Sequence, residues 1–299
     1  MEQYENYFQD KPLKNLNDEV NKSVDPLAPC YYDEVRSLND NTKAKFTTTV
    51  NWRTKDYKQI TIDSFKDTNE KMGIYCLKFD DEKIVAGLRN SQIKIFFLNT
   101  NKLDVLNGGH SGSVLSLAYD QSVLISGSSD SHIVIWNILN YQIIARLYEH
   151  HDRVNNLKFN NQILLSCSHD KKILVWDISN IQKVSLMKNL ANDLIENDLR
   201  CNAIGMNDLY LIAGIFNRIK IWNINNFTFF ASLDGHKKII TCLQMSNDLI
   251  VSASEDETVR IWNLKTRQCL KSLNCHIGEF ICCIDFNEDI LVSGSFRYQ

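Results

Sequence analysis

One segment of this chain recurs at a near-constant interval, and this repetition limits the fold more than any other feature. Close copies read SGSSDSHIVIWN (126–137), SCSHDKKILVWD (166–177) and SASEDETVRIWN (252–263), and weaker ones read AGLRNSQIKIFF (86–97) and AGIFNRIKIWN (213–223). The ring residues near the ends of the copies are, in chain order, Phe96, Trp136, Trp176, Trp222 and Trp262. The intervals between them are 40, 40, 46 and 40 residues, and a period of about 40–45 is typical of four-stranded propeller blades.

The residues ahead of each copy alternate between apolar and polar types. SVLSLAYD (113–120) and SVLISGS (122–128) illustrate this, since apolar residues at every second position suit a strand with two unlike faces. Glycine is scarce, but Asp, Asn and Ser interrupt the runs where turns are needed. The pattern therefore predicts an all-β fold built from repeated short strands.

A histidine recurs with the repeat, about 20 residues before the turn aspartate. His110, His150, His236 and His276 occupy this one position, which accounts for four of the seven histidines. A catalytic histidine occurs once, whereas an architectural one recurs, so the Ser-Asp-His cluster in 126–132 does not indicate a hydrolase triad. Neither a G-x-S-x-G elbow nor a P-loop is found in the sequence, and we expect a protein that is not an enzyme.

Charge and cysteine usage narrow the possible partners. The net charge of −3 argues against bulk binding to nucleic acid or membrane, and no apolar run approaches eighteen residues. The nine cysteines show no C-x-x-C zinc spacing and mostly fall in apolar runs, so we expect core thiols and neither metal nor cofactor. A cytoplasmic or nuclear location, or both, fits this composition.

The repeats resemble the WD40 family, in which each unit runs from a Gly-His pair to a Trp-Asp pair. The resemblance implies a β-propeller, seven-bladed in that family, in which a buried network forms in three of the repeats. It would comprise His110, Asp130 and Trp136; His150, Asp170 and Trp176; and His236, Asp256 and Trp262, each with a strand serine, which is Ser126 or Ser128 in the first set. The first and fourth repeats depart from the pattern and should be less firmly held.

The same resemblance suggests a domain organisation. Residues 1–56 read as a polar linker with a helix near 31–50, and 57–299 as the propeller, with a lone closing strand at about 57–63. Repeats would start near residues 73, 110, 150, 196, 236 and 276, giving five full units and an incomplete sixth. We therefore expect the chain to be a fragment or a truncated version of a complete propeller.

Several segments, among them GHSGSVLSLAYD (109–120) and FNNQILLSCSHDKKILVWD (159–177), resemble the β-transducin-repeat-containing F-box proteins. That resemblance implies a substrate receptor of SCF-type cullin–RING ubiquitin ligases, which holds a doubly phosphorylated Asp-Ser-Gly-x-x-Ser segment on the propeller face. The residues carried over to the first phosphate are Tyr75, Arg89, Ser113 and Ser129. Those carried over to the second are Asn202 and Lys238.

The chain also departs from those proteins. Glu255, Cys282 and Asn155 replace a serine, an arginine and a leucine that would contact the peptide, so the second phosphate position and the preferred sequence are in question. No F-box pattern is seen in residues 1–30. Either an F-box is encoded upstream, which would bring ligase components as partners, or the propeller binds phosphoproteins without delivering them. A scaffold that binds unphosphorylated proteins is the alternative.

Overall fold

The computed structural model describes residues 73–194, 200–246, 248–274, 276, 279–286 and 291–296. The predicted helix near 31–50, the predicted lone strand at about 57–63 and the predicted start of the fourth repeat near 196 lie outside these residues. Within them the regular structure consists of strands and one short 3-10 turn, η2 (Leu190–Asp193). The all-β prediction is confirmed.

The strands form five four-stranded sheets and one two-stranded sheet among the described residues. The first sheet comprises β1 (Ile74–Phe79), β2 (Lys83–Leu88), β3 (Ile93–Phe97) and β4 (Leu103–Leu106). The second comprises β5 (Val114–Tyr119), β6 (Val123–Ser128), β7 (Ile133–Asn137) and β8 (Ile143–Leu147). The third comprises β9 (Val154–Phe159), β10 (Ile163–Ser168), β11 (Ile173–Asp177) and β12 (Ser185–Asn189).

The remaining sheets continue this pattern. The fourth comprises β13 (Cys201–Met206), β14 (Tyr210–Ile215), β15 (Arg218–Asn223) and β16 (Phe229–Asp234). The fifth comprises β17 (Ile240–Met245), β18 (Leu249–Ser254), β19 (Thr258–Asn263) and β20 (Cys269–Asn274). The last pair is β21 (Phe280–Phe286) and β22 (Leu291–Phe296).

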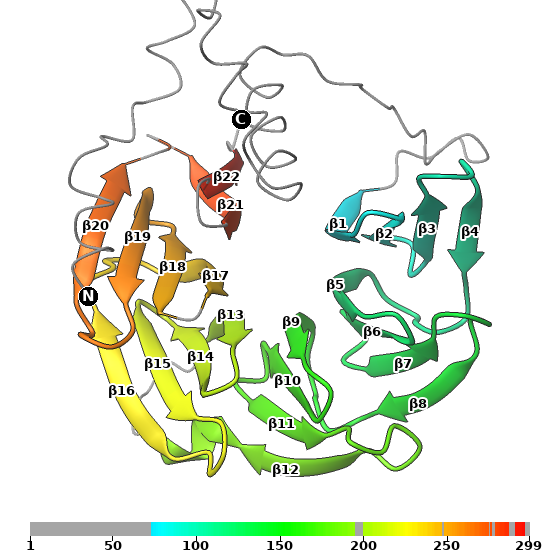
Figure 1. The fold of residues 1–299 in the computed structure, drawn as a ribbon, viewed down its shortest axis with the longest axis horizontal. Helices are drawn as coiled ribbons and strands as arrows, with labels where there is room; N and C mark the ends of the chain where they lie inside the picture. Colours follow the sequence, from blue (N-terminus) through cyan, green and yellow to red (C-terminus); the bar gives the residue numbers. More distant parts are fainter. Residues whose placement is uncertain are drawn as a thin grey trace, which may run out of the picture. The chain divides into compact units, whose positions relative to one another are not determined.

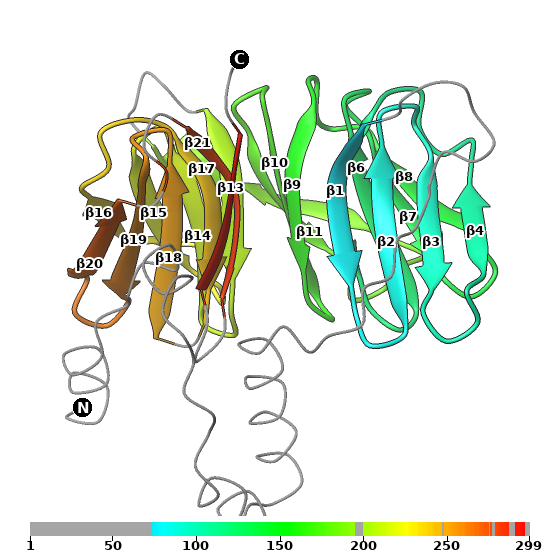
Figure 2. The ribbon, with the colours of Figure 1, turned by 90° about the horizontal axis from the view of Figure 1, so that it is seen from above.

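Each sheet is an antiparallel meander whose strands follow chain order from the inside outward. The sheets succeed one another around a common centre, with β1, β5, β9, β13 and β17 innermost and β4, β8, β12, β16 and β20 outermost (Figure 1). Each innermost strand contacts the innermost strand of the next sheet, and the view from above shows neighbouring sheets standing face to face (Figure 2). This is the radial arrangement of propeller blades.

The innermost strands share a β-bulge, which follows the first paired residue in β1, β5, β9, β13 and β17 and the second paired residue in β21. The register skips one residue in each of them: Tyr75, Leu115, Asn155, Asn202, Thr241 and Cys282. A bulged residue is left out of the strand pairing and its side chain is re-aimed, while the local twist increases. The bulges therefore set these side chains apart from the regular pleat at the same end of every sheet.

Asparagine and aspartate close the turns that glycine would otherwise make. Asp130 and Asp170 accept hydrogen bonds from the backbone N–H two residues later, both at 2.9 Å, and the residue between has a positive φ. That residue is Ser131 (φ 71°) in the second sheet and Lys171 (φ 69°) in the third. The short carboxylate compensates for the strain of a left-handed non-glycine residue.

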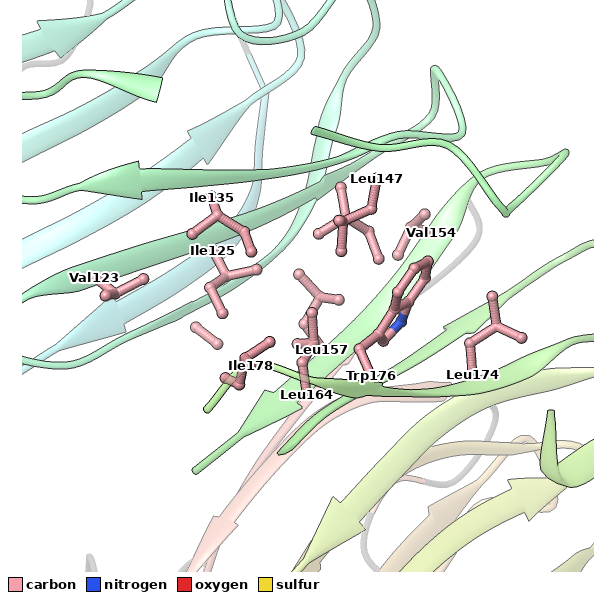
Figure 3. Packing of buried hydrophobic residues seen from close by; sticks show 12 residues of the cluster. Val123, Ile125, Ile135, Leu147, Val154, Leu157, Leu164, Leu174, Trp176 and Ile178 are labelled. Carbon is pink, nitrogen blue, oxygen red and sulfur yellow. The ribbon is translucent and has the colours of Figure 1, made fainter. Parts of the chain in front are cut away.

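The core lies between the sheets and not within any one of them. Ile125 and Ile135 of the second sheet pack with Leu157, Leu164 and Trp176 of the third (Figure 3). Because both faces of a middle strand are covered, all six residues of β6 are buried. Full burial of each such aliphatic side chain contributes about 1.5–3 kcal/mol, so neighbouring sheets depend on one another for stability.

Candidate functional site at the loop edge

A chain of buried polar contacts crosses the second sheet. Trp136 Nε1 donates to Ser126 Oγ at 2.9 Å, and Ser126 Oγ lies 2.7 Å from His110 Nε2. His110 Nδ1 lies 3.0 Å from Asp130 Oδ2, and Asp130 also accepts from two backbone N–H groups of the flanking loops. Of the two candidate serines, Ser126 therefore takes the indole N–H, whereas Ser128 accepts from the backbone of Asp130.

The same chain of contacts occurs in the third and fifth sheets, in the sets His150, Asp170, Ser166, Trp176 and His236, Asp256, Ser252, Trp262. Across the three networks the His Nδ1–carboxylate distance is 3.0–3.1 Å, the His Nε2–Ser Oγ distance 2.7–2.8 Å and the Trp Nε1–Ser Oγ distance 2.8–2.9 Å. A partial version occurs at the sixth repeat, where His276 Nε2 lies 2.9 Å from Ser293 Oγ.

The electrostatics of these networks suit a structural role. Burial tends to raise the pKa of Asp170, but hydrogen bonds from His150 and two backbone N–H groups outweigh it and lower the pKa to about 2. Burial lowers the pKa of His236, which keeps that imidazole neutral at pH 7. The serine hydroxyls of all three networks are fully buried, so none is placed to attack a substrate.

The fourth sheet lacks this network. Trp222 is fully buried, and its Nε1 has no hydrogen-bond acceptor among the described residues. The position that holds Ser126 in the second sheet holds Ala213 here, since each lies two residues beyond the partner of the tryptophan in the strand pairing. An unpaired buried N–H costs about 1–3 kcal/mol, which agrees with the weaker fourth repeat expected from the sequence.

The described part of the chain lacks the features of two other kinds of site. No group of three or more His, Cys, Asp or Glu side chains is placed to hold a metal ion there. No described helix has the length and hydropathy needed to cross a membrane.

A repeated backbone hydrogen bond builds one end of every four-stranded sheet, which we term the loop edge. The N–H of the residue after each second strand donates to the carbonyl of the residue before the innermost strand, at 2.9–3.1 Å. The pairs are Arg89 with Gly73, Ser129 with Ser113, His169 with Arg153, Phe216 with Arg200, and Glu255 with Ile239. Each pair sits beside a bulged residue, so three residues of each four-stranded sheet lie together at this edge.

Four of the sequence-predicted binding residues meet where the first and second sheets adjoin. Ser113 Oγ donates to the Arg89 carbonyl at 2.9 Å, which joins the loop edges of the two sheets. Ser129 pairs with Ser113 through the backbone, and the side chains of Arg89 and Ser129 are exposed. Tyr75, the bulged residue of β1, is 54% exposed beside them. The group offers a guanidinium, the Ser129 hydroxyl and a phenol to solvent, while the Ser113 hydroxyl is bonded to the Arg89 carbonyl.

The other two predicted residues lie on separate sheets. Asn202, the bulged residue of β13, accepts from Asn155 Nδ2 at 3.2 Å. Lys238 is exposed in the loop before β17, where its carbonyl accepts from Ser254 Oγ at 3.1 Å. No hydrogen bond joins Asn202 to Lys238 in the described residues, and Glu255 pairs with Ile239, the residue that follows Lys238.

The family model described as "WD domain, G-beta repeat" matches residues 101–137, 141–177 and 227–263. These segments are WD40 repeats. Each match ends at the third strand of the second, third or fifth sheet, and these are the sheets that carry the complete histidine networks. The WD40 propeller fold predicted from the sequence is therefore confirmed.

Curated relatives match only parts of the chain. The WD repeat-containing protein 89 homolog of Dictyostelium discoideum is 40% identical over 89 residues, 29% of this chain and 24% of that protein. The F-box/WD repeat-containing protein lin-23 of Caenorhabditis elegans is 38% identical over 63 residues, 21% of this chain and 9% of that protein. The matched regions thus span less than a quarter of either relative.

Solved structures agree on the fold. The WD40 β-propeller domain of Doa1 superposes with a TM-score of 0.63 at 24% identity, covering 73% of this chain and 74% of that one. WD40 domains are protein-interaction modules, and the relatives carry them in proteins of different kinds. What this chain shares with all of them is the WD40 fold.

The sequence-based prediction of binding residues did not include three basic residues of the loop edge. Arg153 and His169 occupy in the third sheet the positions of Ser113 and Ser129 in the second, and Arg200 occupies the matching position in the fourth. Aligning the WD40 repeats position by position would have exposed them, because the residue before each turn aspartate and the residue before each innermost strand always reach this edge.

Proposed function

We propose that this propeller binds phosphorylated segments of other proteins at its loop edge. The observation that carries the proposal is the grouping of Arg89, Ser113 and Ser129 where the first two sheets adjoin. A phosphate dianion needs a permanently charged, forked donor surrounded by small hydroxyl donors; Arg89 and Ser129 supply both, and the Ser113 hydroxyl would have to turn from the Arg89 carbonyl to add a third contact. Charge-assisted hydrogen bonds contribute about 1.5–3 kcal/mol each, which is enough for micromolar binding after ordering costs.

Charge along the loop edge favours an anionic ligand. The chain has a net charge of −3, yet the loop edges of the first, third and fourth sheets carry Arg89, Arg153 and Arg200. Glu255 is the only carboxylate among the paired loop-edge residues of the five four-stranded sheets described. A local positive arc on a weakly acidic protein attracts anions by charge complementarity.

A role as the substrate receptor of an SCF-type ubiquitin ligase extends this proposal. It is supported by the resemblance of the repeats to F-box propeller proteins and by lin-23, whose name places an F-box beside WD repeats. A scaffold that binds unphosphorylated partners through the same edge is the competing function. Co-precipitation of cullin and RING subunits with the full-length protein from its own cells distinguishes the two roles.

Titration of a fluorescent Asp-Ser-Gly-x-x-Ser peptide, phosphorylated or not, tests phosphate binding. We expect binding only of the phosphorylated form and at least a tenfold loss of affinity in Arg89→Ala. Arg267→Ala is the matched control, because that guanidinium lies over the Phe230 ring at 4.5 Å in the fifth and fourth sheets, away from the first. Equal binding of both peptide forms, or an unchanged affinity in Arg89→Ala, would refute the proposal.

A further inference from the structure

The loop edges of the third and fourth sheets form a second basic cluster. Arg153 pairs with His169 through the His169 N–H and the Arg153 carbonyl at 3.1 Å, and Arg200 pairs likewise with Phe216 at 3.0 Å. All four residues stand at equivalent repeat positions, so their side chains leave the same edge of the propeller. The cluster lies two sheets away from Arg89 along the chain.

A side-chain hydrogen bond holds the two halves of this cluster together. Asn155 Nδ2 donates to Asn202 Oδ1 at 3.2 Å across the boundary between β9 and β13. These asparagines are the bulged residues of their strands, and each follows its arginine, Arg153 or Arg200, by two positions. The hydrogen bond between the two asparagines therefore connects the loop that carries Arg153 with the loop that carries Arg200.

The guanidinium of Arg153 is weakly engaged within the protein. The Asp152 carboxylate lies beside it, with Oδ1 3.9 Å from Arg153 Nε, and the two side chains are 53% and 52% exposed. An exposed pair at this distance contributes little, and a doubly charged ligand competes with it readily. Arg200 is held differently, with its guanidinium carbon 5.7 Å from the centre of the Phe216 ring. Stacking of this kind fixes the orientation of the planar guanidinium group.

We propose that Arg153, His169 and Arg200 form a second phosphate subsite, which binds a further phosphate of the same peptide that occupies Arg89. This inference rests on the proposed function. It places the second phosphate between the third and fourth sheets, where two arginines and a histidine accompany the one carboxylate of Asp152, and not at Lys238, a single cation next to the Ile239–Glu255 pair. The cluster contributes two forked guanidinium groups and an imidazole, whereas the position in the fifth sheet contributes a single lysine.

A peptide series with one phosphate fixed and a second placed three to eight residues away tests the subsite. For the wild type, we expect one spacing at which the second phosphate raises affinity at least tenfold in fluorescence anisotropy. Arg153→Ala should lose most of that increment and keep the affinity for the singly phosphorylated peptide. Arg153→Lys should keep part of the affinity increment, because lysine retains the positive charge but lacks the forked donor geometry of arginine. Thermal melting of each variant monitors folding.

The outcomes separate this inference from the proposed function. Binding of the singly phosphorylated peptide with no gain at any spacing, or an equal gain in wild type and Arg153→Ala, overturns the second subsite alone. Loss of the gain in Lys238→Ala but not in Arg153→Ala returns the second phosphate to the fifth sheet and also overturns it. An equal gain from glutamate at the second position assigns the cluster to carboxylates instead of phosphate. No phosphate-dependent binding of any peptide overturns both proposals.

Discussion

Replacement of Ser252 by alanine is expected to destabilise the propeller far beyond the size of the change. The Ser252 hydroxyl is fully buried, accepts from Trp262 Nε1 at 2.8 Å and lies 2.7 Å from His236 Nε2. Because Asp256 can only accept, His236 Nδ1 carries the hydrogen of that contact; in the neutral imidazole Nε2 then accepts from the serine. The hydroxyl thus has one accepted and one donated bond, both between buried groups.

The magnitude follows from the two groups left behind. In Ser252→Ala the Trp262 N–H and the His236 Nε2 lose their partners, and each unpaired buried group costs about 1–3 kcal/mol. Removing the hydroxyl also removes its own desolvation cost, so we expect a net loss of about 2–4 kcal/mol. Against a total stability of about 5–15 kcal/mol, this is a large fraction.

A double-mutant cycle measured by urea unfolding with circular dichroism tests this reasoning. In a Trp262→Phe background there is no indole N–H that could lose its acceptor. Ser252→Ala should therefore reduce the free energy of unfolding by about 1 kcal/mol or more less than it does in the wild type. A cost below about 1 kcal/mol in the wild-type background would refute the assignment of the hydroxyl as a buried bridge. So would an equal cost in both backgrounds.

Three further changes test other parts of the structure. Ala213→Ser should supply the missing acceptor to Trp222 and raise the urea midpoint, by about 1 kcal/mol of stability; an unchanged midpoint would show that the indole is already satisfied. The ionised Asp170, with its pKa lowered to about 2, contributes about 2 kcal/mol to the free energy of unfolding above pH 4, and about half of this contribution is lost by pH 3. Asp170→Asn should therefore reduce the loss of stability between pH 4 and pH 3, and an unaltered loss would contradict the reasoning. Lys158 has its pKa lowered to about 8, chiefly by burial, so its charge is costly below pH 8 and the cost vanishes above its ordinary value of 10.5. Lys158→Met should therefore stabilise the protein by about 1–2 kcal/mol at pH 7, even though it removes the 3.0 Å hydrogen bond to Gln244. This gain in stability should shrink as the pH rises, and a gain that is independent of pH would contradict the reasoning.

The buried networks were predictable because the repeats resemble those of the WD40 family. That resemblance implied that the recurring histidine of each of three repeats meets the turn aspartate of the same repeat, and those contacts are present. The choice between Ser126 and Ser128 was not predictable. Both serines are fully buried on the same strand, and only the register of β6 against β7 decides which faces the indole.

The loop edge was only partly predictable, for a different physical reason. Arg153 and Arg200 occur in polar stretches that resemble ordinary solvated loops. Their alignment depends on the bulge in each innermost strand and on the backbone bond to the following turn, both of which form only when that strand pairs with the next one. Spacing within one repeat carries no information about how the edges of neighbouring repeats meet.

The buried network and the loop edge are connected through the turn aspartate. Asp130 accepts from the backbone N–H of Ser111 at 2.8 Å and of His132 at 2.9 Å, which ties the loop before β5 to the turn after β6. Ser113 lies in that loop and Ser129 immediately precedes the aspartate in that turn, so one carboxylate fixes the spacing of both edge residues. A repeat can therefore exchange its edge residues without disturbing the anchor that positions them. This explains how sheets with the same buried chemistry can present hydroxyls in one place and guanidinium groups in the next.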